Sequence, residues 1–457
     1  MFVDSRYCKV INFVIVGISV SLNVQIMEKW LKISLLLCLF GFIKELRPSE
    51  PFTYEFLIGP WKDLTEDEIV KQAFPISTYS NLICLVIIFL VTDMCRYKPL
   101  IILLGLSGIV VWSMLLWTSS LLELIVIEAM YGLFRATEVA YYSYIYAKVD
   151  KEHYQKVTSH TRGAILAGRS ISGVASQVLV STKVLDYEQL NYISLAGVAV
   201  ATIWALFLPP VSKSLYFHSE DSKNQPLSKK AKSAFKLMKS HFINAYTNIY
   251  VLKWSIWWAL STCGYVQVEF YLQPLYSAIQ DDDTNIYNGA VEAIITLLGF
   301  LAALLAGYLK FNWEIKGELT LGIFSLIQGA LIVVVSQTEY LFLCYAFYIV
   351  FGILYHFMIT IASAEIAKRI DEDSYGLIFG INMFVSLVFN SILTAVVATE
   401  GIGFALDPRG QYVVYGGYHL AISLVFMGMG IRTCVVKRKT KIVASGDGEK
   451  RRSISPS

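Results

Sequence analysis

Stretches of about 20 apolar residues recur along almost the whole of this 457-residue chain. An α-helix of that length crosses the hydrocarbon core of a bilayer, which is about 30 Å thick. Only 16% of the residues are charged, compared with about 25% in soluble proteins. We therefore predict an all-α protein that crosses a membrane many times, with the lipid bilayer as its surroundings.

Twelve candidate spans are separated by loops of alternating charge. The spans cover residues 31–45, 77–95, 99–119, 121–147, 160–182, 190–209, 250–277, 288–309, 318–336, 340–367, 374–398 and 412–434. Loops after even-numbered spans are basic, whereas the loops after the first and seventh spans carry the acidic runs 66–68 and 281–283. Because basic loops remain in the cytoplasm, this pattern predicts that both termini are cytoplasmic.

A hydrophilic stretch at 211–249 divides the spans into two sets of six. We expect an N-terminal six-helix bundle at 31–210, this stretch as a cytoplasmic linker, and a C-terminal six-helix bundle at 250–436. Two such bundles are typical of the major facilitator fold, which has its site near the midplane between them. Residues 1–30 form an N-terminal extension, either a further element or an upstream addition to a chain that begins at Met27. The polar residues 437–457 are predicted to be a disordered cytoplasmic tail.

The fourth span is the most informative, because residues 128–146 read EAMYGLFRATEVAYYSYIY. Ionisable side chains inside a membrane helix are costly and usually functional. At 100° per residue, an arc of about 80° holds Glu128, Tyr131, Arg135, Glu138 and Tyr142. Either the three charges neutralise one another, or this face forms the wall of a water-filled cavity.

Other patterns narrow the class of function. Arg169, Glu269 and Glu292 also lie deep in predicted spans, and we expect them to face the same cavity. The chain has no Walker loop, GxSxG or HExxH motif, its six histidines show no ligand spacing, and its seven cysteines show no CxxC spacing. We therefore predict no enzymatic activity, metal site, cofactor or nucleic-acid partner. A channel would use repeated rings of like charge, which the mixed charges here do not form.

Several blocks along the chain carry a family resemblance. They include LCLFGFIKELRPSEPF (37–52), TDMCRYKP (92–99), EAMYGLFRATEVAYYSYIYAKV (128–149) and YGLIFGINMF (375–384). In these blocks the chain resembles the reduced folate carrier family, which comprises folate carriers and thiamine transporters. The resemblance implies a plasma-membrane protein that moves a water-soluble vitamin by alternating access, with a proton or a counter-transported ion as a possible coupling partner.

The resemblance also implies a pocket. Pocket positions of the thiamine branch match Glu50, Trp112, Glu128, Tyr131, Glu138 and Glu292. Glu128 would bind the aminopyrimidine, the two aromatic residues would stack or hydrogen-bond, and the other glutamates would attract the cationic thiazolium. Three basic positions characteristic of the folate branch match Glu138, Gly352 and Asn390, none of which is basic. This favours thiamine as the substrate.

Two arginines depart from the thiamine pattern. Relatives have a small or apolar residue at the position of Arg135 and a pocket tyrosine at that of Arg169. Further departures are Ser77, in place of a pocket aromatic residue, and Phe270, in place of an asparagine. The arginines either pair with Glu128 and Glu138 or form an anion site for folate or for the phosphate of a vitamin ester. The alternatives to a thiamine transporter are therefore a folate carrier that uses Arg135 and Arg169, and a non-transporting vitamin receptor on a transporter scaffold.

Overall fold

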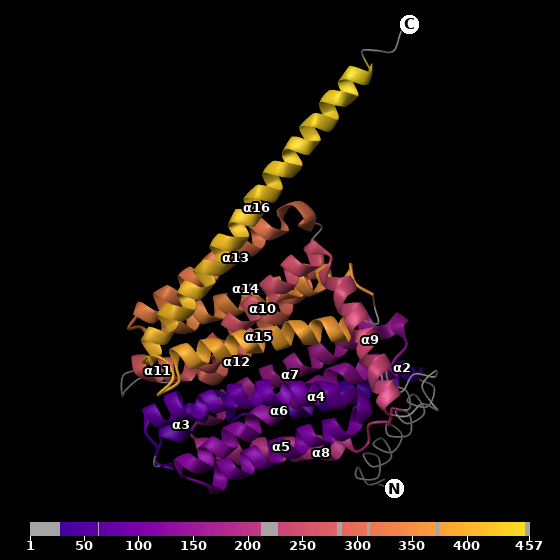
Figure 1. Cartoon of the computed structure of the whole chain (residues 1–457). Helices are drawn as coiled ribbons and strands as arrows, with labels where there is room; N and C mark the ends of the chain where they lie inside the picture. Colours follow the sequence, from indigo (N-terminus) through magenta and orange to yellow (C-terminus); the bar gives the residue numbers. More distant parts are fainter. Residues whose placement is uncertain are drawn as a thin grey trace, which may run out of the picture.

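The computed structural model describes residues 28–62, 64–211, 227–280, 286–308, 311–371 and 374–452, and within these ranges it contains helices and no strand. The long helices are α2 (Lys29–Lys44), α4 (Phe74–Met94), α5 (Lys98–Trp117), α6 (Leu121–Lys148), α7 (Tyr154–Ser181), α8 (Tyr187–Ala205), α10 (Ile249–Phe270), α12 (Asn288–Tyr308), α13 (Trp313–Gln337), α14 (Leu341–Ala367), α15 (Tyr375–Val397) and α16 (Pro408–Arg452). Eleven of the twelve predicted spans each fall on one of these helices, and the seventh, 250–277, covers α10 and the short helix α11 (Leu272–Ile279) that follows it (Figure 1). The lengths of the apolar stretches therefore located the main elements correctly.

Further elements lie between these twelve helices. They are η1 (Glu50–Phe52), α3 (Thr53–Ile58), η2 (Glu68–Ala73), η3 (Lys151–His153), α9 (Leu227–Tyr246) and α11 (Leu272–Ile279). Helix α9 lies inside the predicted linker 211–249 and packs against α10 and α15. Its Tyr246 hydroxyl donates a hydrogen bond to Asn382 Oδ1 at 2.8 Å. The linker is thus partly helical and is attached to the C-terminal bundle.

The long helices form two halves that meet along two helix pairs. In the N-terminal half α5 packs against α6 and α8, and α2 packs against α7 and α8. In the C-terminal half α13 packs against α16, α12 against α14, and α10 against α15. Figure 1 shows the halves as two layers, one coloured indigo to magenta and the other pink to yellow. The halves contact each other where α7 packs against α12 and α4 against α15.

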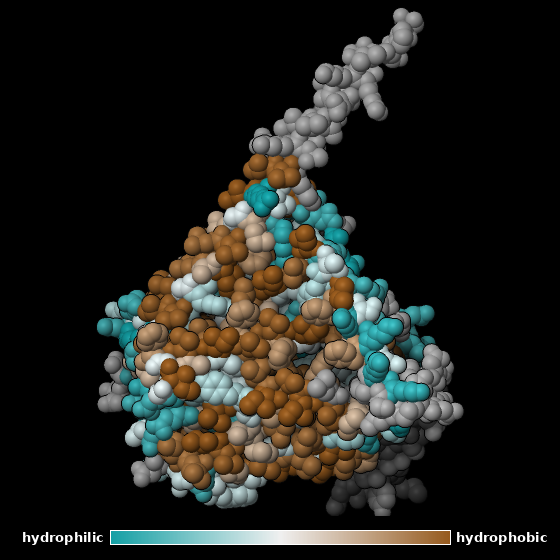
Figure 2. Space-filling view, viewed as in Figure 1, coloured by the Kyte–Doolittle hydropathy of each residue, from teal (hydrophilic) through white to brown (hydrophobic). Residues whose placement is uncertain are grey.

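The molecular surface fits a lipid environment. Eight of the helices in the described ranges are long and apolar enough to cross a membrane, while α2 has only 16 residues. Figure 2 shows hydrophobic residues over the belt between the two ends of the helices and hydrophilic residues gathered at those ends. Exposed apolar side chains follow each other along single helix faces, as Leu297, Leu301 and Leu305 do on α12. An apolar belt of this extent indicates contact with lipid rather than water. The side of the membrane on which the termini lie stays a prediction.

The first long helix is interrupted. Helix α2 ends at Lys44, and the chain has no regular helix until η1 begins at Glu50. Pro48 disfavours the helical conformation of the residue before it and lacks an N–H group, so the helix does not continue through this point. The freed Ser49 N–H donates instead to Ser194 Oγ on α8 at 3.1 Å. Irregular backbone inside a membrane protein is tolerated where it is buried in protein or lines a cavity.

The C-terminal end of the chain differs from the sequence prediction, whereas the N-terminal extension is largely untested. Residues 1–27 of the predicted extension lie outside the described residues, whereas Lys29 and Trp30 already belong to α2. Helix α16 continues to Arg452, although residues 437–457 were predicted to be disordered. Residues 437–452 contain no proline and many good helix formers, so a helix established in the last span can propagate through them. Residues 453–457 lie outside the described ranges.

The interruption of α2 depends on close packing by Gly197 on α8. A Cβ atom at this position would lie 2.5 Å from the carbonyl oxygen of Leu46, which is a backbone atom and cannot rotate away. We predict that Gly197→Ala destabilises the purified protein by about 1–3 kcal/mol, because the interrupted segment must shift. A thermal unfolding measurement in detergent checks this. Gly417→Ala on α16 is the matched control, because a Cβ there would meet nothing within 4 Å. Equal effects of the two substitutions would contradict the prediction.

Candidate functional site

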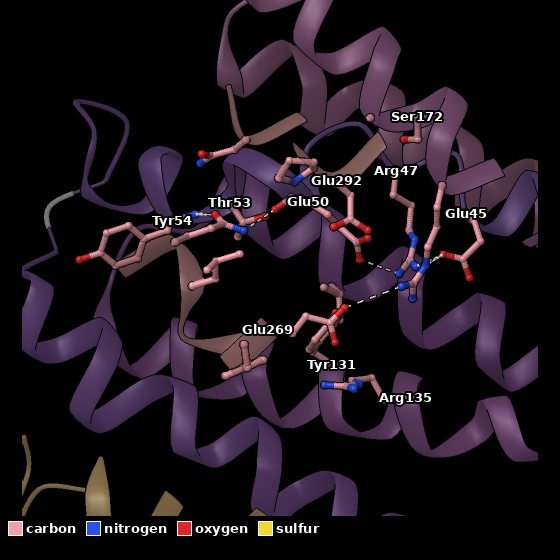
Figure 3. Close-up of a pocket in the computed structure, with 18 of the residues that line it drawn as sticks. Glu45, Arg47, Glu50, Thr53, Tyr54, Tyr131, Arg135, Ser172, Glu269 and Glu292 are labelled. Atoms are coloured by element: carbon pink, nitrogen blue, oxygen red, sulfur yellow. Dashed lines mark hydrogen bonds and ion pairs between the residues drawn. The ribbon is translucent and has the colours of Figure 1, made fainter. Parts of the chain in front are cut away.

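A cavity of about 250 Å³ lies between the two halves and is lined by the interrupted segment after α2 and by residues of α5, α6, α7, α10, α11 and α12. It brings together all eight site residues predicted from the sequence, namely Glu50, Trp112, Glu128, Tyr131, Arg135, Glu138, Arg169 and Glu292. Figure 3 shows several of these side chains converging on the cavity. The structure thus supports the cavity interpretation of the charged face of α6, while the substrate-binding role of each residue stays a prediction.

Glu45 is the centre of an ion-pair network in the interrupted segment. Its carboxylate lies 2.6 Å from Lys44 Nζ, 2.7 Å from Arg47 Nη2 and 2.9 Å from Arg169 Nε on α7. Lys44, Glu45 and Arg47 are only 1%, 2% and 4% exposed. Charges buried this deeply need oppositely charged partners, because removing one partner leaves the other uncompensated. The network therefore fixes the interrupted segment against α7.

Three further glutamates contact cations of this network. Arg47 Nη1 lies 2.7 Å from Glu50 Oε1, and Lys44 Nζ forms an ion pair with Glu138 on α6. The third, Glu269 on α10, is only loosely associated, with Oε1 3.9 Å from Arg169 Nη1. The charges on α6 therefore do not neutralise one another. The expected pairing of Arg135 and Arg169 with Glu128 and Glu138 is not found in the described ranges. Glu138 pairs with Lys44 instead, and Arg169 pairs with Glu45.

Trp112 supports the interrupted segment from α5. Its Nε1–H donates to Ser49 Oγ at 3.0 Å, and its side chain is 2% exposed. The Arg47 guanidinium lies 5.5 Å from the centre of the Trp112 ring and 5.2 Å from that of Phe134, within the range of cation–π attraction. Tyr131 in turn stacks on Phe134, with ring centres 6.0 Å apart. Trp112 thus holds the cavity wall in place, and Tyr131 is the more accessible aromatic residue.

Three ionisable side chains of the cavity remain without an ion pair in the part of the chain that the structure describes. Oε2 of Glu128 is buried and has no hydrogen-bond partner, although Ser77 lies beside the carboxylate. Glu292 on α12 and Arg135 on α6 line the cavity and form no ion pair with any described residue. Unpartnered charged groups in a cavity are available to a ligand.

Gln273 joins the interrupted first helices of the two halves. Its Nε2 donates to the Glu50 carbonyl oxygen at 2.8 Å, and its Oε1 accepts from the Tyr54 N–H at 2.9 Å. Helix α11, which carries Gln273, follows directly on the end of α10 at Phe270, so the first span of each half is broken. A second contact between the halves joins the hydroxyls of Tyr79 and Thr399 at 2.6 Å. These contacts hold the halves together at the end of the molecule where α3 and α11 lie (Figure 1).

The sequence interpretation missed Lys44, Glu45, Arg47 and Gln273. Lys44 and Glu45 stand at the end of the predicted first span and Arg47 just beyond it, and no role was predicted for them. A signal was nevertheless present, because residues 44–50 hold four ionisable side chains and a proline between two apolar stretches. A charged, proline-containing interruption of this kind is typical of a discontinuous membrane helix at a binding site. Gln273 has no comparable signal, because a single glutamine near a span end is common.

Comparison with known proteins identifies the family. The family model described as reduced folate carrier matches residues 28–414. The chain belongs to the reduced folate carrier family. It is 39% identical to human thiamine transporter 1 over 460 residues, which cover 91% of this chain and 92% of that protein. It is also 37% identical to human thiamine transporter 2, with the same coverage of each chain. Folate transporter 1 of Caenorhabditis elegans is 36% identical over 414 residues, which cover 87% of this chain and 91% of the relative.

Solved structures confirm the predicted fold of this family member. A bacterial homologue of the human lysosomal transporter Spinster, in an inward-facing and unoccupied conformation, superposes with a TM-score of 0.61 at 13% identity, covering 90% of this chain and 98% of that one. The human organic anion transporter MFSD10 gives a TM-score of 0.59 at 10% identity, covering 88% and 100%. The chain therefore has the major facilitator fold of a multi-pass membrane transporter.

The pair of Lys44 and Glu138 yields a quantitative prediction. Lys44→Met leaves the buried Glu45 carboxylate and the half-buried Glu138 carboxylate short of a cation, and we expect it to destabilise the protein by about 3–5 kcal/mol. Adding Glu138→Gln should recover part of that loss in stability, because the double variant no longer has a Glu138 carboxylate without its cation. Thermal unfolding of the single and double variants in detergent measures the coupling.

The control for this cycle is Lys71→Met, which removes a lysine from the more exposed pair with Asp67. We expect little change from it, because exposed ion pairs contribute little to stability. The assignment of this pair would be contradicted if the double variant lost as much stability as the two single variants lose in sum.

Proposed function

We propose that this protein takes up thiamine across the plasma membrane by alternating access of its two halves around the cavity. The observation that carries the proposal is the buried Glu128 carboxylate, whose Oε2 has no partner. It lies in a cavity lined by six glutamates and three arginines. Such a cavity has an excess of negative charge, which favours an organic cation over an anion.

The chemistry of thiamine fits the residues that are free to bind it. Its aminopyrimidine presents donors that a carboxylate accepts as charge-assisted hydrogen bonds, which is the role proposed for Glu128. Its thiazolium is a cation, for which the Tyr131 ring and the Glu292 carboxylate provide complementary surfaces. Glu128 belongs to the N-terminal half and Glu292 to the C-terminal half. A ligand held by both would link its binding to the relative movement of the halves.

The second candidate, a folate carrier, is supported by the resemblance to the folate transporter of Caenorhabditis elegans. Folate carries two carboxylates and would need two available cations. Arg169 is already engaged by Glu45 at 2.9 Å, so Arg135 is the cavity arginine without an ion pair in the described ranges. Gly352 and Asn390, at positions that are basic in the folate branch, supply no further cation. The available charges therefore favour thiamine.

A proton is the coupling ion that the cavity chemistry supports. Protonating Glu128 or Glu292 would cancel the negative charge that attracts the substrate cation. Binding of a proton would thereby promote release of thiamine. A non-transporting receptor would bind the vitamin without moving it, so accumulation of label inside sealed vesicles distinguishes transport from sensing.

Uptake of labelled thiamine by proteoliposomes that contain the full-length protein tests the proposal. We expect Glu128→Gln to raise KM roughly 10- to 100-fold, because a charge-assisted contact becomes a neutral one. Glu123→Gln is the matched control on the same helix. It lies at the exposed start of α6, where its carboxylate caps the Ser120 N–H at 2.9 Å, and glutamine preserves such a cap. Folate uptake that excess thiamine leaves untouched would overturn the proposal.

A further inference from the structure

Helix α9 combines a high positive charge with exposed apolar side chains. Its 20 residues include five lysines and no acidic residue. Phe235 is 69% exposed, and Phe242 and Ile243 are 43% and 49% exposed. Large apolar side chains gathered at a surface mark a site of contact with a partner or a membrane. This mixture of lysines and apolar residues is typical of helices that lie on a membrane surface.

The exposed apolar residues of α9 share one face with three of its lysines. At 100° per residue, this face spans about 120° and begins about 60° around the helix from the buried Ala245. We call it the basic apolar face, and its members are the exposed residues Phe235, Phe242, Ile243, Lys232, Lys236 and Lys239. The neighbouring arc holds the exposed polar residues Ser233, Ser240 and Asn244. The helix thus has a side that packs on the protein, a side suited to water and a basic apolar face that is largely exposed.

The position of α9 brings the basic apolar face to the boundary of the membrane. Helix α9 ends at Tyr246, and α10, which holds the seventh predicted span, begins at Ile249. The start of a span lies where the hydrocarbon core meets the lipid headgroups. Figure 1 shows α9 running across the direction of the neighbouring long helices, which places its axis near the plane of the membrane. The basic loops predict that this end faces the cytoplasm, whose leaflet carries the anionic lipids.

The attachment of α9 to the protein favours a lipid surface over a protein partner. A protein that binds a basic amphipathic helix takes the apolar side chains of that helix into a groove. The last turn of α9 is already fixed, because Ala245 is 5% exposed and the Tyr246 hydroxyl is bonded to Asn382 on α15. A groove would therefore collide with α10 and α15, against which α9 packs. A lipid surface needs access to one face only.

We propose that α9 docks on the anionic lipid headgroups of the cytoplasmic leaflet. Lys232, Lys236 and Lys239 contact lipid phosphates and carboxylates, and Phe235 and Phe242 lie at the boundary between the headgroups and the acyl chains. Because α9 packs on α15, and α15 contacts α4 of the other half, docking links the lipid to the contact between the halves. The inference concerns a surface outside the cavity and does not depend on the substrate.

The test is hydrogen–deuterium exchange of the full-length protein in lipid nanodiscs that hold one copy each. Discs of phosphatidylcholine alone are compared with discs that contain about one third phosphatidylserine, which supplies the anionic headgroups. We expect amide exchange in residues 229–243 to slow roughly 10-fold in the anionic discs, because docking suppresses local opening of the helix. At about 0.5 M salt this slowing should largely disappear, because salt screens the attraction between lysines and headgroups.

Variants of the basic apolar face separate the charge from the apolar contact. The triple variant Lys232→Gln, Lys236→Gln and Lys239→Gln should lose the slowing of exchange in anionic discs. Phe235→Ser should reduce the slowing several-fold, because it removes an apolar side chain from the lipid. Leu237→Ser is the matched control. Leu237 is also exposed, at 43%, but lies about 100° beyond Lys236 around the helix and outside the face.

Equal exchange of α9 in the two kinds of disc would overturn the inference. Slowing that persists in the triple variant or at high salt would also overturn it, because the lysines would then have no part in the contact. Protection by added calcium-loaded calmodulin but not by phosphatidylserine would assign the face to a protein partner. Protection that appears only with two copies per disc would assign it to a second copy of the chain, and both results contradict the inference. If the triple variant does not reconstitute, the salt series of the wild-type protein decides.

Discussion

Burying a charge among apolar helices is so unfavourable that ion pairing determines how this protein is built. Lys44, Glu45 and Arg47 lie almost completely inside the N-terminal half, and each needs an opposite charge from a neighbouring element. Glu138 comes from α6 and Arg169 from α7. The ion pairs therefore set the positions of the interrupted helix, α6 and α7 relative to one another. The cavity is bounded by the elements that these pairs hold in place.

The same requirement divides the cavity charges into two groups with different roles. The paired charges stabilise the interrupted segment, and their potentials largely cancel. The groups outside these pairs, above all Glu128, Glu292 and Arg135, are the ones that a substrate can use. Two of these three are carboxylates, which is the physical basis for proposing a cationic vitamin.

Much of this arrangement could be predicted from the sequence, because it follows from local patterns. Apolar length located every long helix, and helical periodicity placed the charged face of α6 toward a cavity. The pairing partners could not be predicted in the same way. Lys44 and Glu138 are 94 positions apart in the chain, so their contact depends on how α2 and α6 pack. Helix α9 was missed because its lysines suggested a polar linker, although Phe235, Met238 and Phe242 recur at helical spacing.

A structure of the full-length protein determined with bound thiamine would test the central claim most directly. Our account predicts that the aminopyrimidine is hydrogen-bonded to Glu128, that the thiazolium lies near Tyr131 and Glu292, and that Lys44 remains paired with Glu138. A ligand held instead by Arg169, with the Glu45 contacts broken and Glu128 away from the ligand, would contradict it.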